Sequence, residues 1–350
     1  MTERAVWIGL ARAGLALVGL TVAVFLGWNA LTGSELSLLF SGWCVPAVAF
    51  LHLAQQGGCG CAWRRLIDTP RPSRWAFFRI RWVRASIAAL LPLSGVGAAF
   101  VAVRLATRAG LRLDVASASL TLDATMEMIS QIIFTALGFG LLLVATPEAR
   151  ILDWAVATLS LAVLIAATFV AAQRIGGMRV IEFGLSTLAR RWPRFLPLTE
   201  VRLHDELMRL HQQPRALAAA GLLHFGSWLL GAGEIWLILG ALGHPASAAK
   251  CVIIESLSMV GRSAGFFVPG ALGVQEVALV LAGKLVGLSV ETAIMIAIVK
   301  RLRDIVIGVP GLFVWQWAEG FRLEISQIAK ALRPVLVRRP FGATSAAKDH

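Results

Sequence analysis

The most unusual residues of this 350-residue chain are charged groups in the middle of an apolar segment. The range 290–315 is largely apolar, but its centre reads Lys300-Arg301-Leu302-Arg303-Asp304. At about 1.5 Å per helical residue, this cluster lies roughly 15–20 Å from the start of the helix, near the centre of a bilayer. Each charge at that depth costs roughly 2.5–3.5 kcal/mol on insertion scales. Two roles fit: an internal site for an anion or phosphate, or a knot of salt bridges between helices.

The spacing within the cluster predicts how its charges are shared. Lys300 and Asp304 are four residues apart, so their side chains meet on one face of a helix and we expect them to form an ion pair. That pairing leaves Arg301 and Arg303 as surplus positive charge. We therefore predict that Lys300, Arg301 and Arg303 hold an anionic group.

A break rich in Gly and Pro precedes the cluster and supplies a second candidate binding element. It contains Pro269, which interrupts the helix, and the candidate binding residues Arg262, Gly270, Gly273, Gln275 and Glu276. A helix that restarts near Gly273 exposes backbone N–H groups, which attract anions. Glu276 also complements the dipole of this helix, so a capping role is the alternative. Glu234 and Glu255 are further acids in apolar surroundings, and each is either a proton-coupling group or a partner of Arg262.

The composition indicates that membrane helices position these residues. Hydrophobic residues make up 57% of the chain and charged residues only 15%, against about 25% charged in soluble domains. The mean hydropathy is +0.75. These values exclude an ordinary soluble domain and predict an all-α, polytopic integral membrane protein. The net charge of +13 lies mainly between apolar segments, where it sets topology, so we expect no nucleic-acid partner.

The order of apolar segments and basic connections predicts a topology. Segments long enough to span a bilayer occupy 8–28, 36–54, 124–145, 152–172, 215–241 and 290–314. The positive-inside rule places the Arg-rich connections and the basic tail in the cytoplasm. Both termini are then cytoplasmic, and the short connections near 29–35, 147–151 and 242–249 face outward. The Arg- and Trp-rich composition is typical of a GC-rich bacterial genome, so we expect a bacterial inner membrane protein.

Two apolar stretches, 85–103 and 252–287, are interrupted by Pro and Gly. The first has Arg-rich flanks on both sides, so its two ends favour the same side of the membrane. Its centre holds Pro92, Gly95 and Gly97, which suit a broken helix that enters the membrane and returns. A plain span with a kink at Pro92 is the alternative. We expect both breaks to act as gates.

An offset of 177 residues relates the two halves of the chain. It places Ser86 on Ser263, Pro92 on Pro269, and Gly110-Leu111 on Gly287-Leu288. The predicted topology gives the halves opposite orientations, as in secondary transporters that have their site at the repeat interface. The long helix of the first half carries Asp123 and Glu127, again four residues apart. We expect these acids to lie near the basic cluster and to neutralise it at rest.

The chain is therefore expected to form one transmembrane domain over 1–341. Its first half is about 1–172 and its second about 215–318. The linker 173–214 has apolar residues at helical spacing, which predicts a pair of amphipathic helices at the membrane interface. The basic tail 319–341 suits anionic lipid at the inner leaflet, and 342–350 is expected to be disordered.

Metal and catalytic motifs are scarce. Among the four cysteines only Cys59 and Cys61 are close, in the sequence 57–61, and two thiols fall short of a four-ligand zinc site. We interpret this motif as the flexible end of a loop and expect no metal and no cofactor. The chain has no nucleophile elbow, P-loop or dinucleotide fingerprint, so we expect no enzyme activity.

Several motifs resemble the transmembrane (flippase-like) region of lysylphosphatidylglycerol synthases. They are Phe267–Glu276, Gly287–Glu291 and Lys300–Asp304 in the second half, and Leu90–Gly97 with Gly110-Leu111 in the first. The similarity covers roughly 80–318 and is strongest to a branch associated with hopanoid-biosynthesis gene clusters. Family members commonly have Gly-Gly-Glu after the first break, whereas this chain has Gly97-Ala98-Ala99. In the best-known members this region is thought to translocate an aminoacylated phospholipid, and a separate soluble domain transfers the amino acid. The resemblance implies a stand-alone lipid-handling module.

The sequence therefore predicts an inner-membrane lipid translocase for a polar or anionic lipid, with a hopanoid-related lipid as one candidate. Membrane lipids are the expected partners, with lipid-biosynthesis enzymes as further candidates. Two alternatives remain open: a secondary transporter of a small soluble anion, and a non-transporting scaffold for lipid-synthesis enzymes.

Overall fold

The computed structural model describes residues 43–67, 71–91, 94–147, 149–175, 203–265 and 271–319, which form ten helices and no strand. The helices of the first half are α3 (Cys44–Arg65), α4 (Arg74–Leu90), α5 (Ser94–Arg108), α6 (Leu113–Ala145) and α7 (Ala149–Arg174). Those of the second are α9 (Leu203–His211), α10 (Pro214–Ala241), α11 (Ala248–Ala264), α12 (Val274–Leu285) and α13 (Val290–Glu319). The predicted span 8–28, most of the linker, the tail 320–350, and Pro92, Pro269 and Gly270 lie outside the described residues.

The helices confirm an all-α membrane protein. Among the described residues α6, α7 and α10 are long and apolar enough to cross a bilayer. Most of α7 is exposed, including Leu152, Val163 and Leu164, and this apolar surface suits contact with lipid. The 30-residue α13 is equally long but carries the charged cluster at its centre.

The glycine-rich motif 57–61 lies inside α3, so its interpretation as a loop end is wrong. The glycines allow neighbouring helices to approach closely. A Cβ on Gly58 would lie 2.6 Å from the Ser227 hydroxyl of α10, and one on Gly60 would lie 3.1 Å from the Phe77 backbone of α4. The motif therefore serves helix packing, as small residues commonly do in membranes.

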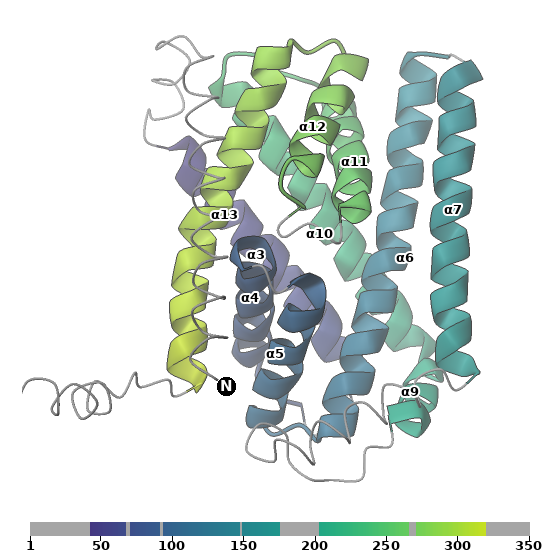
Figure 1. Cartoon of the computed structure of the whole chain (residues 1–350), viewed down its shortest axis with the longest axis vertical. Helices are drawn as coiled ribbons and strands as arrows, with labels where there is room; N and C mark the ends of the chain where they lie inside the picture. The colour runs from purple at the N-terminus through teal and green to yellow at the C-terminus, as the bar shows by residue number, and fades with distance from the viewer. Residues whose placement is uncertain are drawn as a thin grey trace, which may run out of the picture.

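Each Pro-Gly break separates two short helices that pack on each other. The chain turns back between α4 and α5, and again between α11 and α12. Ser73 and Ser247 cap the first helix of each pair by accepting hydrogen bonds from the N–H groups of Ala76 and Lys250. This arrangement agrees with the re-entrant prediction and not with a kinked span. Figure 1 shows the hairpins in opposite halves of the molecule, α4–α5 below and α11–α12 above.

The two halves repeat the same packing. The offset of 177 residues places the start of α6, Leu113, on the start of α13, Val290. α6 packs on α11 of the other half, α13 packs on α4, and α3 packs on α10. In Figure 1 α6 runs upward and α13 downward. The helices thus form two inverted repeats whose hairpins approach the middle of the fold from opposite ends.

The part of the amphipathic linker that is described is α9, and its apolar face is not free for lipid. Leu203, Leu207 and Leu210 are buried against α3, α6 and α10, in one cluster with Ala62 and Leu122. The expected amphipathic helix is present in this segment, and its apolar stripe packs on protein rather than on lipid. The second predicted helix lies outside the described residues.

Candidate functional site

A cavity of about 360 Å³ lies between the two hairpins, and six helices line it. Its lining includes five bases and three acids: Arg81, Arg84, Arg262, Lys300, Arg303, Glu127, Glu255 and Asp304. Apolar and neutral residues complete the wall, including Ala85, Ala88, Ala89, Trp228 and Met259. Both repeats therefore contribute charge to one cavity.

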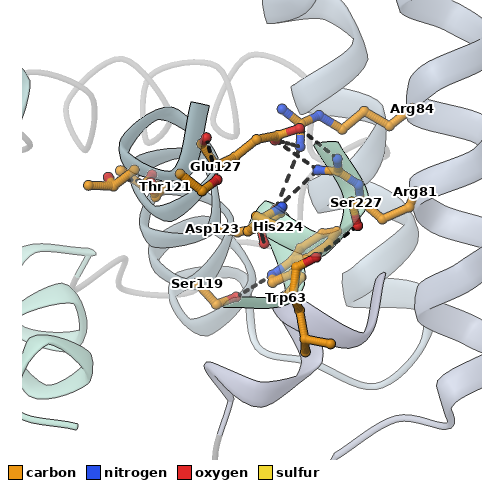
Figure 2. Close-up of polar contacts among 12 residues, drawn as sticks. Trp63, Arg81, Arg84, Ser119, Thr121, Asp123, Glu127, His224 and Ser227 are labelled. Atoms are coloured by element: carbon orange, nitrogen blue, oxygen red, sulfur yellow. Dashed lines mark hydrogen bonds and ion pairs between the residues drawn. The ribbon is translucent and has the colours of Figure 1, made fainter. Parts of the chain in front are cut away.

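The first wall is an ion-pair network centred on Arg81 of α4 (Figure 2). The Arg81 guanidinium donates from Nη2 to Glu127 Oε1 at 2.9 Å, and from Nη1 to Glu127 Oε2 at 3.1 Å and Asp123 Oδ2 at 3.2 Å. Asp123 and Glu127 lie one turn apart on α6. His224 of α10 completes the group, with Nε2 2.9 Å from Asp123 Oδ1. Arg81, Asp123 and His224 are buried. Their contacts with one another are therefore needed, because an isolated charge at a buried position would be costly.

The second wall is a network centred on Arg303 of α13. Arg303 contacts Glu234 of α10 and Asp304, the latter at 2.6 Å. His52 of α3 lies 3.0 Å from Glu234 through Nδ1. Lys300 pairs with Glu255 of α11, and its ammonium is 4.0 Å from Glu234. The cluster is therefore bonded to α10 and α11 directly, and to α3 through Glu234.

These contacts correct the predicted pairing of Lys300 with Asp304. Lys300 reaches Glu255 instead, while Asp304 binds Arg303 and lies 3.7 Å from Arg301. A carboxylate on a facing helix offers a buried partner that spacing along one helix does not reveal.

The prediction of surplus positive charge around Arg301 and Arg303 is also wrong, because acids on the other helices balance it. The two networks and their neighbours contain six bases and six acids, which are Arg81, Arg84, Arg262, Lys300, Arg301, Arg303, Asp123, Glu127, Glu234, Glu255, Glu276 and Asp304. Asp123 and Glu127 pair with Arg81 on α4 and not with the α13 cluster, although Glu127 shares its cavity.

The N-terminus of α12 is capped by a glutamate of the same helix. Glu276 accepts the Gly273 N–H through Oε2 at 2.8 Å and pairs with Arg301 through Oε1. Gly273 has φ +82°, which favours glycine. The capping role of Glu276 is thus the observed one. Arg301, Gly273 and Gln275 do not line the central cavity, and neither do Gly95 and Gly97 in the first turn of α5.

Comparison with known families decides what these helices are. The family model described as "Lysylphosphatidylglycerol synthase TM region" matches residues 7–311. The chain belongs to the lysylphosphatidylglycerol synthase transmembrane family. The match includes every residue that lines the cavity. Comparison with curated proteins and with solved structures found no match.

Two arginines of this family member retain hydrogen-bonding capacity toward the cavity. Arg84 Nη1 is buried without a hydrogen-bond partner and lies 3.8 Å from both Asp123 Oδ2 and Glu127 Oε2. Arg262 forms no ion pair with another described residue, because Glu234 and Glu255 bind Arg303 and Lys300 instead. Of the two roles considered for Glu234 and Glu255, the one as a partner of Arg262 is therefore not observed. From the sequence, Arg84 belonged only to the Arg-rich flank of 85–103, which was used to predict topology.

Sequence reasoning also missed the neighbours of Cys59. Ligand atoms of Cys59, Glu127 and His224 lie within 4.8 Å of one another, a spacing that could hold a metal ion. Both carboxylate oxygens of Glu127 already accept from Arg81, and Arg84 lies beside them. A cation would have to displace one positive charge and sit near another, so the geometry of this family member favours an ion-pair network.

Proposed function

We propose that the protein moves a polar or anionic lipid between the leaflets of a bacterial inner membrane. The observation that carries this proposal is the charged cavity between two hairpins of opposite orientation. Membership in a family named for a lipid synthase's membrane region supports a role in lipid handling. The hairpins enter from opposite ends and could open the cavity to either side in turn, as inverted repeats do in transporters.

Arg84 and Arg262 are the residues best suited to hold the head group. Each lies on the first helix of a hairpin, one in each repeat, and each lines the cavity. A guanidinium presents a planar fork that grips phosphate or carboxylate oxygens. A head group bound by both arginines would bridge the hairpins. Lys300 and Arg303 then act mainly as the paired wall, because their hydrogen bonds are already made within the protein.

The composition of the wall supports a lipid over a small soluble anion. Ala85, Ala88 and Ala89 form an apolar strip along α4, and Met259 and Trp228 extend it. A fully hydrated anion gains nothing from such surface, whereas the glycerol and upper acyl carbons of a lipid do. A hopanoid-related lipid belongs to this proposal as one candidate substrate.

We also propose an orientation of the protein in the membrane. The Arg-rich ends of α3, α5 and α7 would face the cytoplasm, together with both termini. We propose no enzyme activity. Membrane lipids, and enzymes that make them, are the proposed partners.

Lipid transfer in reconstituted vesicles tests this function. Vesicles would carry a fluorescent phosphatidylglycerol, and an impermeant quencher would report its exchange between leaflets. Arg84→Gln and Arg262→Gln should each slow exchange by about tenfold or more, since each removes one charged hydrogen-bond donor. Arg112→Gln is the matched control, because Arg112 lies outside the cavity and is exposed.

Two results would overturn the proposal. One is exchange at the wild-type rate in the folded Arg84→Gln/Arg262→Gln protein. The other is uptake of phosphate into the vesicles without lipid exchange, which would favour the soluble-anion transporter. A protein that exchanges no lipid while binding lipid-synthesis enzymes would favour the scaffold.

A further inference from the structure

A second cavity, of about 250 Å³, lies between α4, α5 and the end of α13. Its walls are apolar apart from two arginines, and its lining is Ala76, Arg79, Ile80, Val83, Leu105, Arg108, Ala109, Val314 and Ala318. It shares no lining residue with the central cavity. We call it the α4–α13 groove.

The two arginines give the groove a positive end. Arg79 Nε is buried without a hydrogen-bond partner, and no carboxylate of the described residues forms an ion pair with Arg79. Arg108 is exposed and donates from Nη1 to the Ala318 carbonyl at 2.6 Å, which holds its guanidinium across the groove from α5 to α13. A buried donor without a partner is costly, so an acceptor from outside the described chain would stabilise it.

The groove lies at a level typical of the boundary between lipid and water. Trp75 and Trp317 are 60% and 80% exposed and neighbour the lining residues Ala76 and Ala318. Exposed tryptophans mark the head-group level of membrane proteins. The same end of the fold carries Arg64 and Arg65 at the end of α3, and Arg71 and Arg74 around the start of α4. An apolar slot with arginines at this level matches a single lipid.

We propose that the α4–α13 groove binds one anionic phospholipid of the leaflet on the Arg-rich side. Its phosphate lies between Arg79 and Arg108, and an acyl chain follows Ile80, Val83 and Val314. Charge favours this occupant over the chain's own tail, because 320–339 carries five bases and one acid and would be repelled. Basic pockets between helices bind phospholipid head groups by the same physics. The lipid would fasten the first hairpin to α13 and does not need to be transported.

Photocrosslinking with peptide mapping tests the site directly. The full chain in vesicles would receive phosphatidylglycerol with a diazirine in its acyl chain, or the matching phosphatidylcholine. We expect labels on peptides from α4, α5 and the end of α13, several-fold stronger with phosphatidylglycerol. Arg79→Ala/Arg108→Ala should lower that labelling by about thirtyfold, since it removes both positive charges that face the phosphate.

Three further variants separate the effects of charge, of groove shape and of the central cavity. Arg65→Ala/Arg74→Ala removes the same charge from exposed positions at the same end, outside the groove, and should leave labelling unchanged. Ala109→Leu fills the groove without changing charge and should lower labelling. A central-cavity variant, Arg262→Gln, should slow lipid exchange and leave the groove labelled, so the two proposals fail separately.

Three outcomes would overturn the proposed lipid site. The first is equal labelling by the two lipids. The second is an effect of Arg65→Ala/Arg74→Ala as large as that of Arg79→Ala/Arg108→Ala. The third is full loss of labelling with millimolar glycerol phosphate, which would show a site for a soluble anion.

Discussion

The two repeats use the same helices but place opposite charges on them. In the first, the long helix α6 carries the acids Asp123 and Glu127, and the hairpin helix α4 carries Arg81. In the second, the long helix α13 carries Lys300 and Arg303, and their acids come from α11 and α10. The offset of 177 residues even places Asp123 on Lys300. The framework is thus repeated while the charge at this position changes sign, although the same offset places Glu127 on Asp304 and keeps an acid there.

The comparison also shows how the halves are joined. The first network takes His224 from the second half, and the second network takes His52 from the first. Any movement of one half against the other therefore changes a histidine–carboxylate contact. Opposite charges at equivalent positions make such contacts possible without a cluster of like charges.

The largest effect is expected where one base serves two acids. Arg81→Met removes the main partner of Glu127 and leaves the buried Asp123 with His224 and the more distant Arg84, so we expect a loss of stability of about 3–5 kcal/mol. Thermal unfolding in detergent, followed by tryptophan fluorescence, measures it. Arg81→Met/Glu127→Gln should recover part of the loss. A stable single variant would show that Arg81 is not the centre of the first network.

In the second network Lys300 has two acids nearby, so removing one of them should reduce the stability less. Glu255→Gln removes the direct partner of Lys300 but leaves Glu234 at 4.0 Å, and we expect a loss of about 2–3 kcal/mol. Lys300→Met/Glu255→Gln should be more stable than Glu255→Gln alone. Additive losses in this double-mutant cycle would contradict the pairing.

Close packing between the halves should be alike in both repeats. A Cβ on Gly138 of α6 would lie 2.6 Å from Ser256 Cβ of α11, and one on Gly311 of α13 would lie 2.9 Å from Ser86 Cβ of α4. Gly138→Ala and Gly311→Ala should each destabilise by about 1–3 kcal/mol in the same unfolding assay. Ser256→Gly should partly rescue Gly138→Ala. Gly140→Ala is the control, because its Cβ would meet nothing within 4 Å.

The smallest effect is expected at an ion pair between an exposed arginine and a buried acid at a helix start. Arg112 is 75% exposed and lies 2.5 Å from Asp114. Arg112→Ala should change the unfolding free energy by less than about 1 kcal/mol, because water screens the exposed Arg112 and Asp114 still accepts the Val115 N–H at the start of α6. A loss comparable with that of Glu255→Gln would mean that burial does not separate the two classes of ion pair.

The sequence predicted the framework better than the contacts. Hydropathy and the 177-residue offset located the long helices and both breaks, because each signal lies within one segment. Partners such as Glu255 and Lys300 are 45 residues apart along the chain and meet only through helix packing. The roles of Arg81 and Arg84 were missed for a different reason. Because they lie in an Arg-rich stretch, they were interpreted as part of a cytoplasmic connection, whereas they belong to α4 and line the cavity. Gly57–Cys61 misled because glycine serves loops and close helix contacts alike.

The uneven hydropathy of the helices has a consequence for biosynthesis. Among the described helices, α6, α7 and α10 are apolar enough to leave the insertion machinery for lipid unaided, whereas the short hairpins and the charged α13 are not. We expect the polar helices to stay at the insertion machinery until partners arrive. His224, on α10, reaches Asp123 only after more than half of the chain has been made. The contacts between the halves would then close last, and an orphaned first half would present Asp123 and His52 without His224 and Glu234, a polar surface that membrane proteases and chaperones can recognise.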